Sequence, residues 1–168
     1  VTDKRNKEYA LDFDGVDDYV EINDDSESLD FTGSLTIEFW FKAKEQPEFG
    51  SSAVIMGKGK SQGPPEFSWL FEYYSGGAIQ FIVVYQPIGD RVVQINGVND
   101  NQWHHLAGVV SSTQQLIYLD GQLQDSTNIT GPVIINDHPL SLGKVYQDSG
   151  RWSKHINGQM KEIKIWKQ

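Results

Sequence analysis

The sequence predicts an all-β fold, either a sandwich or a barrel, and three observations indicate it. Apolar and polar residues alternate along many short segments, and no long stretch repeats its apolar residues with the 3.6-residue period of a helix. Turn sequences such as Asp14-Gly15, Asn96-Gly97 and Asn157-Gly158 separate nearly all of these segments. Short alternating strands with regular turns are typical of β-sandwiches and β-barrels. The length of 168 residues predicts a single domain that covers residues 1–168.

The expected strands follow from this alternation and from their β-branched and aromatic residues. Residues 34–43 show the pattern most clearly, with Leu35, Ile37, Phe39 and Phe41 on one face and Thr36, Glu38, Trp40 and Lys42 on the other. In chain order, the expected strands are 9–13, 19–22, 34–43, 53–56, 67–74, 78–85, 91–95, 103–110, 116–119, 133–135, 140–143 and 159–168. We expect long strands from the two ends of the chain to lie side by side and close a sheet.

Two turns predict hairpins. Ser75-Gly76-Gly77 joins strands 67–74 and 78–85, and Asp120-Gly121 follows strand 116–119. Asp-Gly is a strong two-residue hairpin signal, because a type I′ turn needs positive φ at both central positions. Longer loops are expected at 44–52, 57–66 and 146–155, and loops on a rigid sandwich are where binding groups usually lie.

The composition excludes several classes of protein. A formal net charge of −9 argues against a nucleic-acid backbone or an anionic membrane as partner, and it suits neutral or cationic ligands and calcium. The alternative is that the acidity only keeps a secreted protein soluble. With no cysteine, disulfides and cysteine zinc sites are excluded, and no apolar run approaches the roughly 20 residues that span a bilayer. The chain opens Val1-Thr2 rather than with Met, so we expect a piece excised from a larger secreted protein.

Four blocks, in order along the chain, resemble the laminin G-like domains of the concanavalin A-like superfamily. They are residues 10–20 (ALDFDGVDDYV), 35–42 (LTIEFWFK), the central hairpin from Trp103-His104-His105-Leu106-Ala107 to Tyr118-Leu119-Asp120-Gly121, and residues 140–143 with 157–166. The resemblance implies a jelly-roll sandwich of two curved antiparallel sheets, and a binding module rather than an enzyme. Members of the family bind sugars, proteins and sometimes steroids or lipids.

One residue departs from the family pattern. Members often carry an Asp directly before the Glu of the last strand, and here that position is Lys161. If that Asp helps to hold a structural calcium ion in relatives, the resemblance implies that the site is altered or missing in this chain.

Acidic side chains in two neighbouring loops are candidate calcium ligands. Asp14, Asp17, Asp18 and Asp24 offer carboxylate oxygens, and calcium binds six to eight oxygen ligands. The spacing and the missing terminal Glu exclude an EF-hand. The alternative is that these residues are simply good turn formers.

The densest aromatic cluster is the candidate sugar site. Sugar rings present apolar C–H faces that stack on aromatic rings, and we expect one or two of Trp69, Tyr73, Tyr74 and Tyr85 to be exposed for this purpose, with Arg91 as a polar neighbour. The alternative is that these rings fill the core. The loop 146–155 adds Tyr146, Arg151 and Trp152, and Trp152 is the best single loop candidate for ligand contact.

Catalytic signals are weak. Jelly-roll glycosidases place two carboxylates across a sugar bond, often at alternating positions of one strand, whereas Glu21, Asp24 and Glu27 do not alternate and Glu38 stands alone. His104 and His105 are adjacent on a strand, point to opposite faces, and are read as structural. We therefore expect a non-catalytic, extracellular carbohydrate-binding module that binds a polysaccharide by aromatic stacking, with calcium assistance. The alternatives are an adhesion domain that binds a protein on a cell surface, and a glycoside hydrolase or polysaccharide lyase with an unrecognised site.

Overall fold

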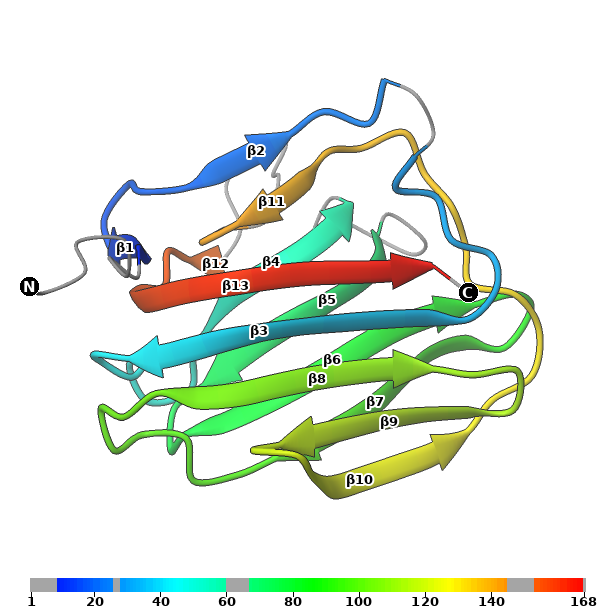
Figure 1. The fold of residues 1–168 in the computed structure, drawn as a ribbon. Coiled ribbons are helices and arrows are strands. Elements are labelled where there is room, and N and C mark those ends of the chain that lie inside the picture. The colour runs from blue at the N-terminus through cyan, green and yellow to red at the C-terminus, as the bar shows by residue number, and fades with distance from the viewer. Residues whose placement is uncertain (1–8, 26–27, 60–66, 145–152, 168) are drawn as a thin grey trace, which may run out of the picture.

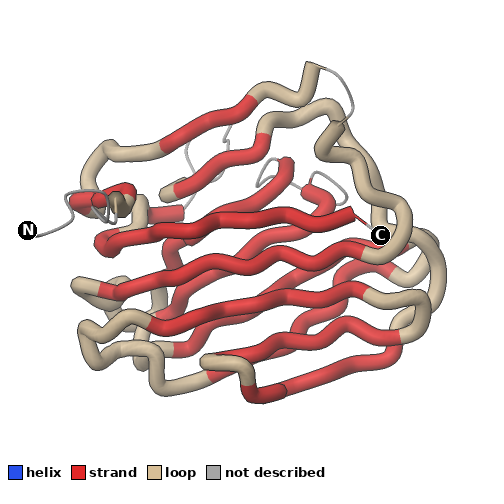
Figure 2. The backbone as a smooth tube through the Cα atoms, in the orientation of Figure 1, coloured by secondary structure: helices blue, strands red, loops and turns tan. Residues whose placement is uncertain are grey.

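The computed structural model describes residues 9–25, 28–59, 67–144 and 153–167, and the regular elements within them are strands (Figures 1 and 2). They are β1 (Leu11–Asp14), β2 (Val20–Ile22), β3 (Leu35–Ala43), β4 (Ser52–Gly59), β5 (Phe67–Tyr74), β6 (Ala78–Tyr85), β7 (Gly89–Ile95), β8 (His104–Val110), β9 (Gln114–Leu119), β10 (Gln122–Asn128), β11 (Leu140–Leu142), β12 (Ser153–Lys154) and β13 (Asn157–Lys167). No helix in these parts of the chain is long and apolar enough to cross a membrane.

The strands form two sheets that face each other across the core (Figure 1). The six-stranded sheet has the order β1-β13-β3-β8-β9-β10. The seven-stranded sheet has the order β2-β11-β4-β5-β6-β7, with β12 beside β4. Neighbouring strands are antiparallel, except that β12 runs parallel to β4. The predicted all-β sandwich is therefore confirmed.

Strands from the two ends of the chain close the six-stranded sheet, as the sequence predicts. β13 lies between β1 and β3, so that Phe13 is opposite Gly158 and Phe41 is opposite Met160. This pairing brings the turn after β1, the start of β13 and the end of β3 to one rim of the sandwich.

The core forms where inward-facing residues of the two sheets meet. The ring of Phe39 on β3 meets Phe71 on β5 edge-on, with 5.1 Å between centroids, and Phe71 stacks on Phe81 of β6 at 4.6 Å. Gly108 on β8 faces these rings, and a Cβ atom there would lie 2.6 Å from Cζ of Phe71. The absence of a side chain at Gly108 therefore lets the two sheets pack closely.

Several strand boundaries differ from the predictions. Residues 133–135 form no strand: Val133 makes one isolated bridge to Tyr85, and Ile134 donates its N–H to Val84 O from a loop that folds over the sheet edge. Their apolar side chains indicated a strand, but Val133 and Ile134 are buried as loop residues. β4 continues to Gly59, where the sequence predicts a loop from residue 57, and residues 60–66 lie outside the described residues.

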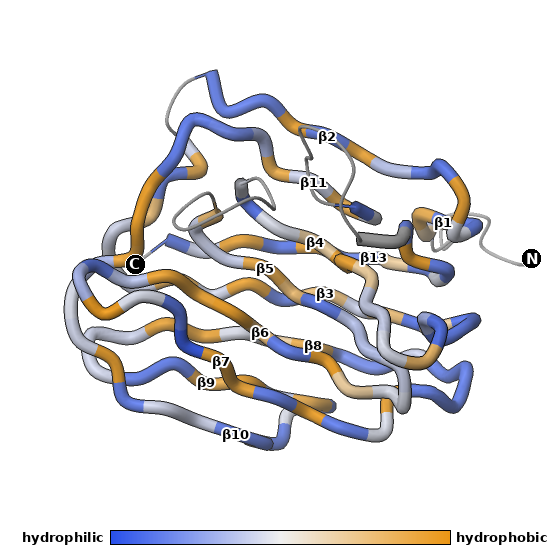
Figure 3. The backbone as a smooth tube through the Cα atoms, turned by 180° about the vertical axis from the view of Figure 1, so that it is seen from behind, coloured by the Kyte–Doolittle hydropathy of each residue, from blue (hydrophilic) through white to orange (hydrophobic). Residues whose placement is uncertain are grey.

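The hairpin at Asp120-Gly121 is confirmed, with φ of 49° and 77° as a type I′ turn requires. Its second strand, β10, is not among the expected strands because it lacks an apolar face. β10 lies at the edge of the six-stranded sheet, is mostly exposed, and is largely hydrophilic in Figure 3. Its backbone pairing with β9 and the preceding turn determine its conformation, not hydrophobic alternation.

Candidate functional site

Three of the four aromatic residues predicted to bind sugar lie in the core. Trp69, Tyr73 and Tyr85 are at most 1% exposed, because their strand positions face the opposite sheet. The hydroxyl of Tyr73 donates to Val98 O at 3.0 Å, and that of Tyr85 donates to Oε1 of Gln115 at 3.1 Å. Burial raises the pKa of Tyr73 to about 12. The expectation of an exposed stacking ring is therefore wrong for these three residues, since Trp69 and Tyr73 lie on the inner face of β5.

Tyr74 and Arg91 are half-buried and do not form a common site. Tyr74 lies on the outer face of the seven-stranded sheet, where its hydroxyl donates to Oε2 of Glu72 at 2.7 Å. Arg91 is opposite Val83, a core residue, and its guanidinium donates to Ile88 O and Asp90 O. The two side chains therefore belong to opposite faces of the sheet. Tyr146, Arg151 and Trp152 lie outside the described residues.

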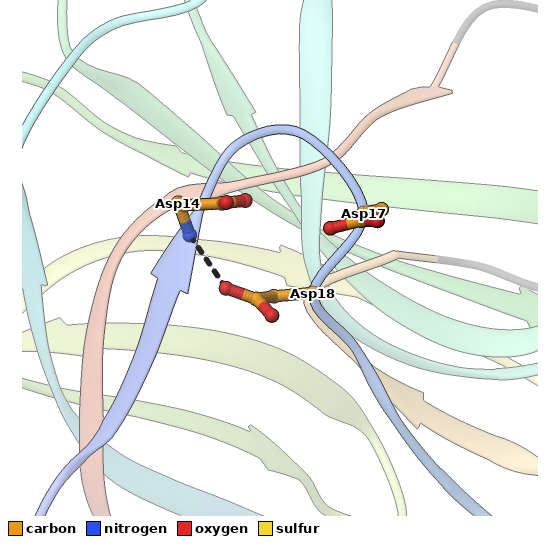
Figure 4. A group of neighbouring side chains, drawn as sticks. All are labelled: Asp14, Asp17 and Asp18. Atoms are coloured by element: carbon orange, nitrogen blue, oxygen red, sulfur yellow. Dashed lines mark hydrogen bonds between the residues drawn. The ribbon is translucent and has the colours of Figure 1, made fainter.

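Three of the four predicted metal ligands do come together. One carboxylate oxygen from each of Asp14, Asp17 and Asp18 lies within 4.8 Å of the others in the turn after β1 (Figure 4). Val16 N–H donates to Oδ1 of Asp14 at 2.8 Å, and Asp14 N–H donates to Oδ2 of Asp18 at 3.1 Å. All three side chains are exposed. An all-oxygen donor set of this kind fits a hard cation such as calcium.

Asp24 does not belong to that group. Its Oδ2 lies 2.9 Å from Nζ of Lys58 on β4, and both side chains are at most 1% exposed. The same ammonium donates to Asn136 O at 2.5 Å and His138 O at 2.7 Å. The prediction of Asp24 as a metal ligand is wrong, because its carboxylate already forms a buried ion pair with the ammonium of Lys58.

A pocket of about 290 Å³ adjoins the aspartate group at the same rim. It lies between the turn after β1, the loop after β3 and the residues that lead into β13. The acidic residues Asp14, Glu45 and Glu48 line it together with His155 and Asn157. Nδ2 of Asn157 donates to Oε2 of Glu45 at 3.0 Å, which ties β13 to the loop after β3. Asp14 belongs to both the pocket and the aspartate group, so a cation held there would border the pocket.

The outer face of the six-stranded sheet carries aromatic residues that the sequence analysis did not select. Three of the chain's five tryptophans lie on it: Trp40 on β3, Trp103 just before β8, and Trp166 on β13. Trp40 is opposite His105 and their rings are 5.4 Å apart. We call these four residues the aromatic face. Trp166 is 52% exposed, whereas Trp40, Trp103 and His105 are half-buried. The sequence does contain the signal, since Trp40 and Trp166 alternate with apolar residues and so fall on the outer side of their strands.

Glu38 links three polar groups on this face. Trp166 donates its indole N–H to Oε1 of Glu38 at 3.3 Å, and Nζ of Lys164 lies 3.4 Å from the same oxygen. Nε2 of His105 lies 3.5 Å from Oε2. Burial acts to raise the pKa of Glu38, but the bonds from Trp166 and Lys164 outweigh it and hold the pKa below its ordinary value. The lowered pKa favours the ionised form of Glu38, which accepts the hydrogen bond from the Trp166 indole.

Lys161, the residue that departs from the family pattern, lies on the same face. Its Nζ is 4.9 Å from the centroid of the Trp103 ring and 5.8 Å from that of Trp40. Asp14 is opposite Asn157, four residues earlier on β13, so Lys161 is about 13 Å further along the strand at about 3.3 Å per residue. The lysine therefore contributes to the aromatic face rather than to the aspartate group.

Comparison with known proteins relates residues 14–168 to one family. A laminin G family model described as the concanavalin A-like lectin/glucanases superfamily matches residues 14–168. In Rattus norvegicus, the sushi, von Willebrand factor type A, EGF and pentraxin domain-containing protein 1 is 25% identical over 140 residues, 79% of this chain. The chain spans only 4% of that relative's length.

Solved structures share the fold at low sequence identity. Domains LG4-5 of the mouse laminin alpha1 chain superpose with a TM-score of 0.72 and 16% identity, covering 99% of this chain and 44% of that one. A structure of botulinum neurotoxin type C superposes with a TM-score of 0.73 and 13% identity, covering 97% of this chain and 40% of that one.

Proposed function

Because the chain belongs to the concanavalin A-like lectin/glucanase superfamily, in its laminin G branch, we propose that it is a non-catalytic carbohydrate-binding module of a larger extracellular protein. The observation that carries the proposal is the aromatic face, where Trp40, Trp103 and Trp166 share one outer sheet surface with His105. Apolar C–H faces of sugars stack on such rings, and polar groups beside the rings bond to the hydroxyls.

The polar groups on this face can bond to sugar hydroxyls, and Glu38 does not fit the general acid of a glycosidase. Thr36, Glu38 and Lys42 alternate with Trp40 along β3 and offer donors and acceptors next to the rings. A glycosidase acid must be protonated at working pH, which requires a raised pKa. The pKa of Glu38 is instead lowered by Trp166 and Lys164 against the effect of burial. Glu38 therefore fits the role of a fixed hydrogen-bond acceptor.

A distant member of the fold offers a parallel for glycan binding. Botulinum neurotoxin type C depends on interaction with two ganglioside molecules to enter cells. At 13% identity this parallel supports a glycan as the class of ligand and says nothing about which residues bind it.

Calcium bound by Asp14, Asp17 and Asp18 is part of the proposal. The ion would bring positive charge to an acidic rim of the sandwich. It would also restrict the turn after β1, which borders the pocket lined by Glu45, Glu48 and Asn157. Its expected role is to stiffen these loops. The calcium site and the aromatic face can be tested by separate variants, because the aromatic face lies on the outer surface of the sheet and the aspartates lie at its rim.

Binding to a panel of polysaccharides, measured with calcium and again with chelator, tests the proposal. We expect at least one polysaccharide to bind, and Trp40→Ala and Trp166→Ala each to weaken that binding about tenfold, equivalent to about 1.4 kcal/mol. Tyr19→Ala is the matched control, because Tyr19 is an exposed aromatic residue at the rim, 49% exposed. A hit that both tryptophan variants leave unchanged would overturn the assignment of the aromatic face. Silence across the panel would overturn glycan binding and favour a protein partner, and release of reducing ends would favour an enzyme.

A further inference from the structure

An acceptor triplet for N-linked glycans lies at the end of an edge strand. Asn128-Ile129-Thr130 has the pattern Asn-x-Thr, with x other than Pro, and the sequence holds no second Asn-x-Ser or Asn-x-Thr triplet. Asn128 is the last residue of β10, and β10 is the outermost strand of the six-stranded sheet. The triplet therefore stands where the sheet meets solvent, the kind of place that a bulky, hydrophilic glycan requires.

The triplet exposes its two recognised side chains and buries the residue between them. Asn128 and Thr130 are exposed, whereas Ile129 is buried in the core. Ile129 also donates its N–H to Thr113 O at 2.9 Å, which anchors the backbone of the triplet. Oδ1 of Asn128 accepts a long bond of 3.4 Å from Nε2 of Gln114, and its Nδ2 donates to none of the described residues. A glycan on Nδ2 would thus point into solvent without displacing a core contact.

The half of β10 that ends at Asn128 lacks the features that guard a free strand edge. Such edges pair readily with other chains, and proteins blunt them with bulges, charges, prolines or a cover. In the first half of β10, a β-bulge lies between Leu123 and Asp125, and Oδ2 of Asp125 accepts the N–H of Gln94 on β7 at 3.0 Å. Residues 126–128 then pair with β9 in regular register and carry neither a charge nor a proline. A cover at Asn128 would protect this second half.

We propose that Asn128 is an N-glycosylation site, and that its glycan covers the free edge of β10 and keeps the domain from pairing edge to edge. The inference goes beyond the proposed function and shares with it only the extracellular location, because the glycan is attached during secretion. Nothing in it depends on the aromatic face or on the aspartate group.

The attachment is a group transfer to the side-chain amide. Nδ2 of Asn128 forms a bond to the anomeric carbon of an oligosaccharide carried on a lipid diphosphate. The bond from that carbon to the diphosphate oxygen breaks, the lipid diphosphate leaves with the electron pair, and the amide releases one proton. The hydroxyl of Thr130 is the group that the secretory transferase recognises beside the acceptor asparagine.

Secretion of the full chain from cultured eukaryotic cells, behind a cleavable signal peptide, tests the modification. We expect the secreted wild type to lose mass when a peptide N-glycosidase removes its glycan, and peptide mass spectrometry to find Asn128 converted to Asp by that enzyme. Thr130→Ala should abolish both signals. Thr130→Ser is the matched control, because it keeps the hydroxyl and the acceptor pattern and should retain them. Secreted wild type with an unmodified Asn128 would overturn the proposal.

Sedimentation velocity over a range of protein concentrations tests the role of the glycan at the edge. The glycosylated wild type should remain monomeric, whereas Thr130→Ala, which lacks the glycan and leaves β10 unchanged, should sediment faster as its concentration rises. Asn128→Lys also lacks the glycan but places a charge on the same edge, so it should remain monomeric. Unchanged melting temperatures show that the variants are folded. A Thr130→Ala variant that is monomeric throughout, or an Asn128→Lys variant that associates equally, would overturn the edge role.

The readouts separate this inference from the proposed function. Glycan occupancy is measured by mass and self-association by sedimentation, so neither measurement needs a polysaccharide ligand. Silence across the polysaccharide panel would overturn carbohydrate binding and leave the assignment of Asn128 intact. An unmodified Asn128 would overturn this inference and leave the binding role of the aromatic face intact.

Discussion

Lys58 and Asp24 form an ion pair inside the sandwich, with 2.9 Å between Nζ and Oδ2. Asp30 approaches the same ammonium at 3.7 Å, and the carbonyls of Asn136 and His138 accept its remaining N–H groups. One buried cation thus fastens two loops, the one after β2 and the one before β11, to β4. Asp24, Asn136 and His138 all lie outside the named strands, so this ammonium adds a side-chain link between each loop and the sheet.

Breaking this pair should destabilise the domain strongly. Lys58→Met leaves the buried Asp24 without its counter-charge, and Asp24→Asn leaves the ammonium of Lys58 with only the more distant Asp30. We expect each variant to lower the free energy of unfolding by about 3–5 kcal/mol. Urea unfolding measures the loss. The control is Lys44→Met, which removes the exposed pair with Asp12 and should cost far less. Equal, small losses in all three variants would contradict the assigned role of Lys58.

The same pair should be visible in the acid dependence of stability. Burial acts to raise the pKa of Asp24, but the bonds from Lys58 and Leu29 outweigh it, so the folded pKa is lower than the ordinary value of about 3.9. Its contribution is therefore fully present above about pH 4 and is lost as pH falls through the lower folded pKa. The free energy of unfolding should fall between pH 6 and pH 2, and it should fall less in Asp24→Asn than in the wild type.

His104 should stabilise the fold most at low pH. Its Nδ1 lies 2.8 Å from Oδ2 of Asp120, and its Nε2 lies 3.1 Å from Oδ1 of Asp100. Burial acts to lower the pKa of His104, but the two carboxylates outweigh it and raise the pKa above its ordinary value. The stabilisation is therefore present below about pH 6.5 and is lost as pH rises through the raised folded value. An NMR titration of His104 checks the direction, and Asp120→Asn should bring the pKa down; a titration midpoint below 6.5 in the wild type would contradict it.

Gly108 should tolerate no side chain. The Cβ of Gly108→Ala would meet the rings of Phe71 and Phe81 at 2.6–2.8 Å, and overpacking of this kind costs about 1–3 kcal/mol. Ala107→Ser is the matched control, because the neighbouring Ala107 lies on the outer side of the strand. Chemical denaturation compares the two, and a Gly108→Ala variant as stable as the control would show that the sheets can separate slightly without loss.

Much of the fold could be predicted because one face of most strands is buried. In β3 the alternation of Phe39 and Phe41 with Trp40 and Lys42 gives both the strand and its inner face, and the family resemblance built on such blocks is confirmed. Alternation does not reveal which element covers a face. It therefore could not separate Trp69, which packs under the six-stranded sheet, from Trp40, whose ring lies on the outside.

The candidate site was only partly predictable for a similar reason. Asp14, Asp17 and Asp18 come together because they share one tight turn, a local property that sequence spacing records. Asp24 depends on Lys58, a partner 34 positions later in the chain, and its role is set by a contact that spacing does not encode. The aromatic face depends in the same way on the register of β13 against β3, which places Lys161 opposite Trp40.

Calcium should stabilise the domain through the aspartate group. A ligand that binds only the folded state stabilises it by RT ln(1 + [L]/Kd), about 2.7 kcal/mol at a hundredfold excess over Kd. We expect millimolar calcium to raise the melting temperature of the wild type, and Asp14→Asn, Asp17→Asn and Asp18→Asn each to reduce that rise. Asp25→Asn is the control, because Asp25 is an exposed acid outside the group.

Magnesium distinguishes a calcium site from general screening of the acidic rim. Magnesium demands a smaller, near-octahedral shell and keeps several waters, so its effect at equal concentration should be smaller. Both ions could instead raise the melting temperature equally, with the rise retained in Asp17→Asn and reduced by added sodium chloride. That result would mean that the three carboxylates act only as surface charge. Binding of polysaccharide measured in the same aspartate variants would then show whether the rim contributes to ligand binding without a metal.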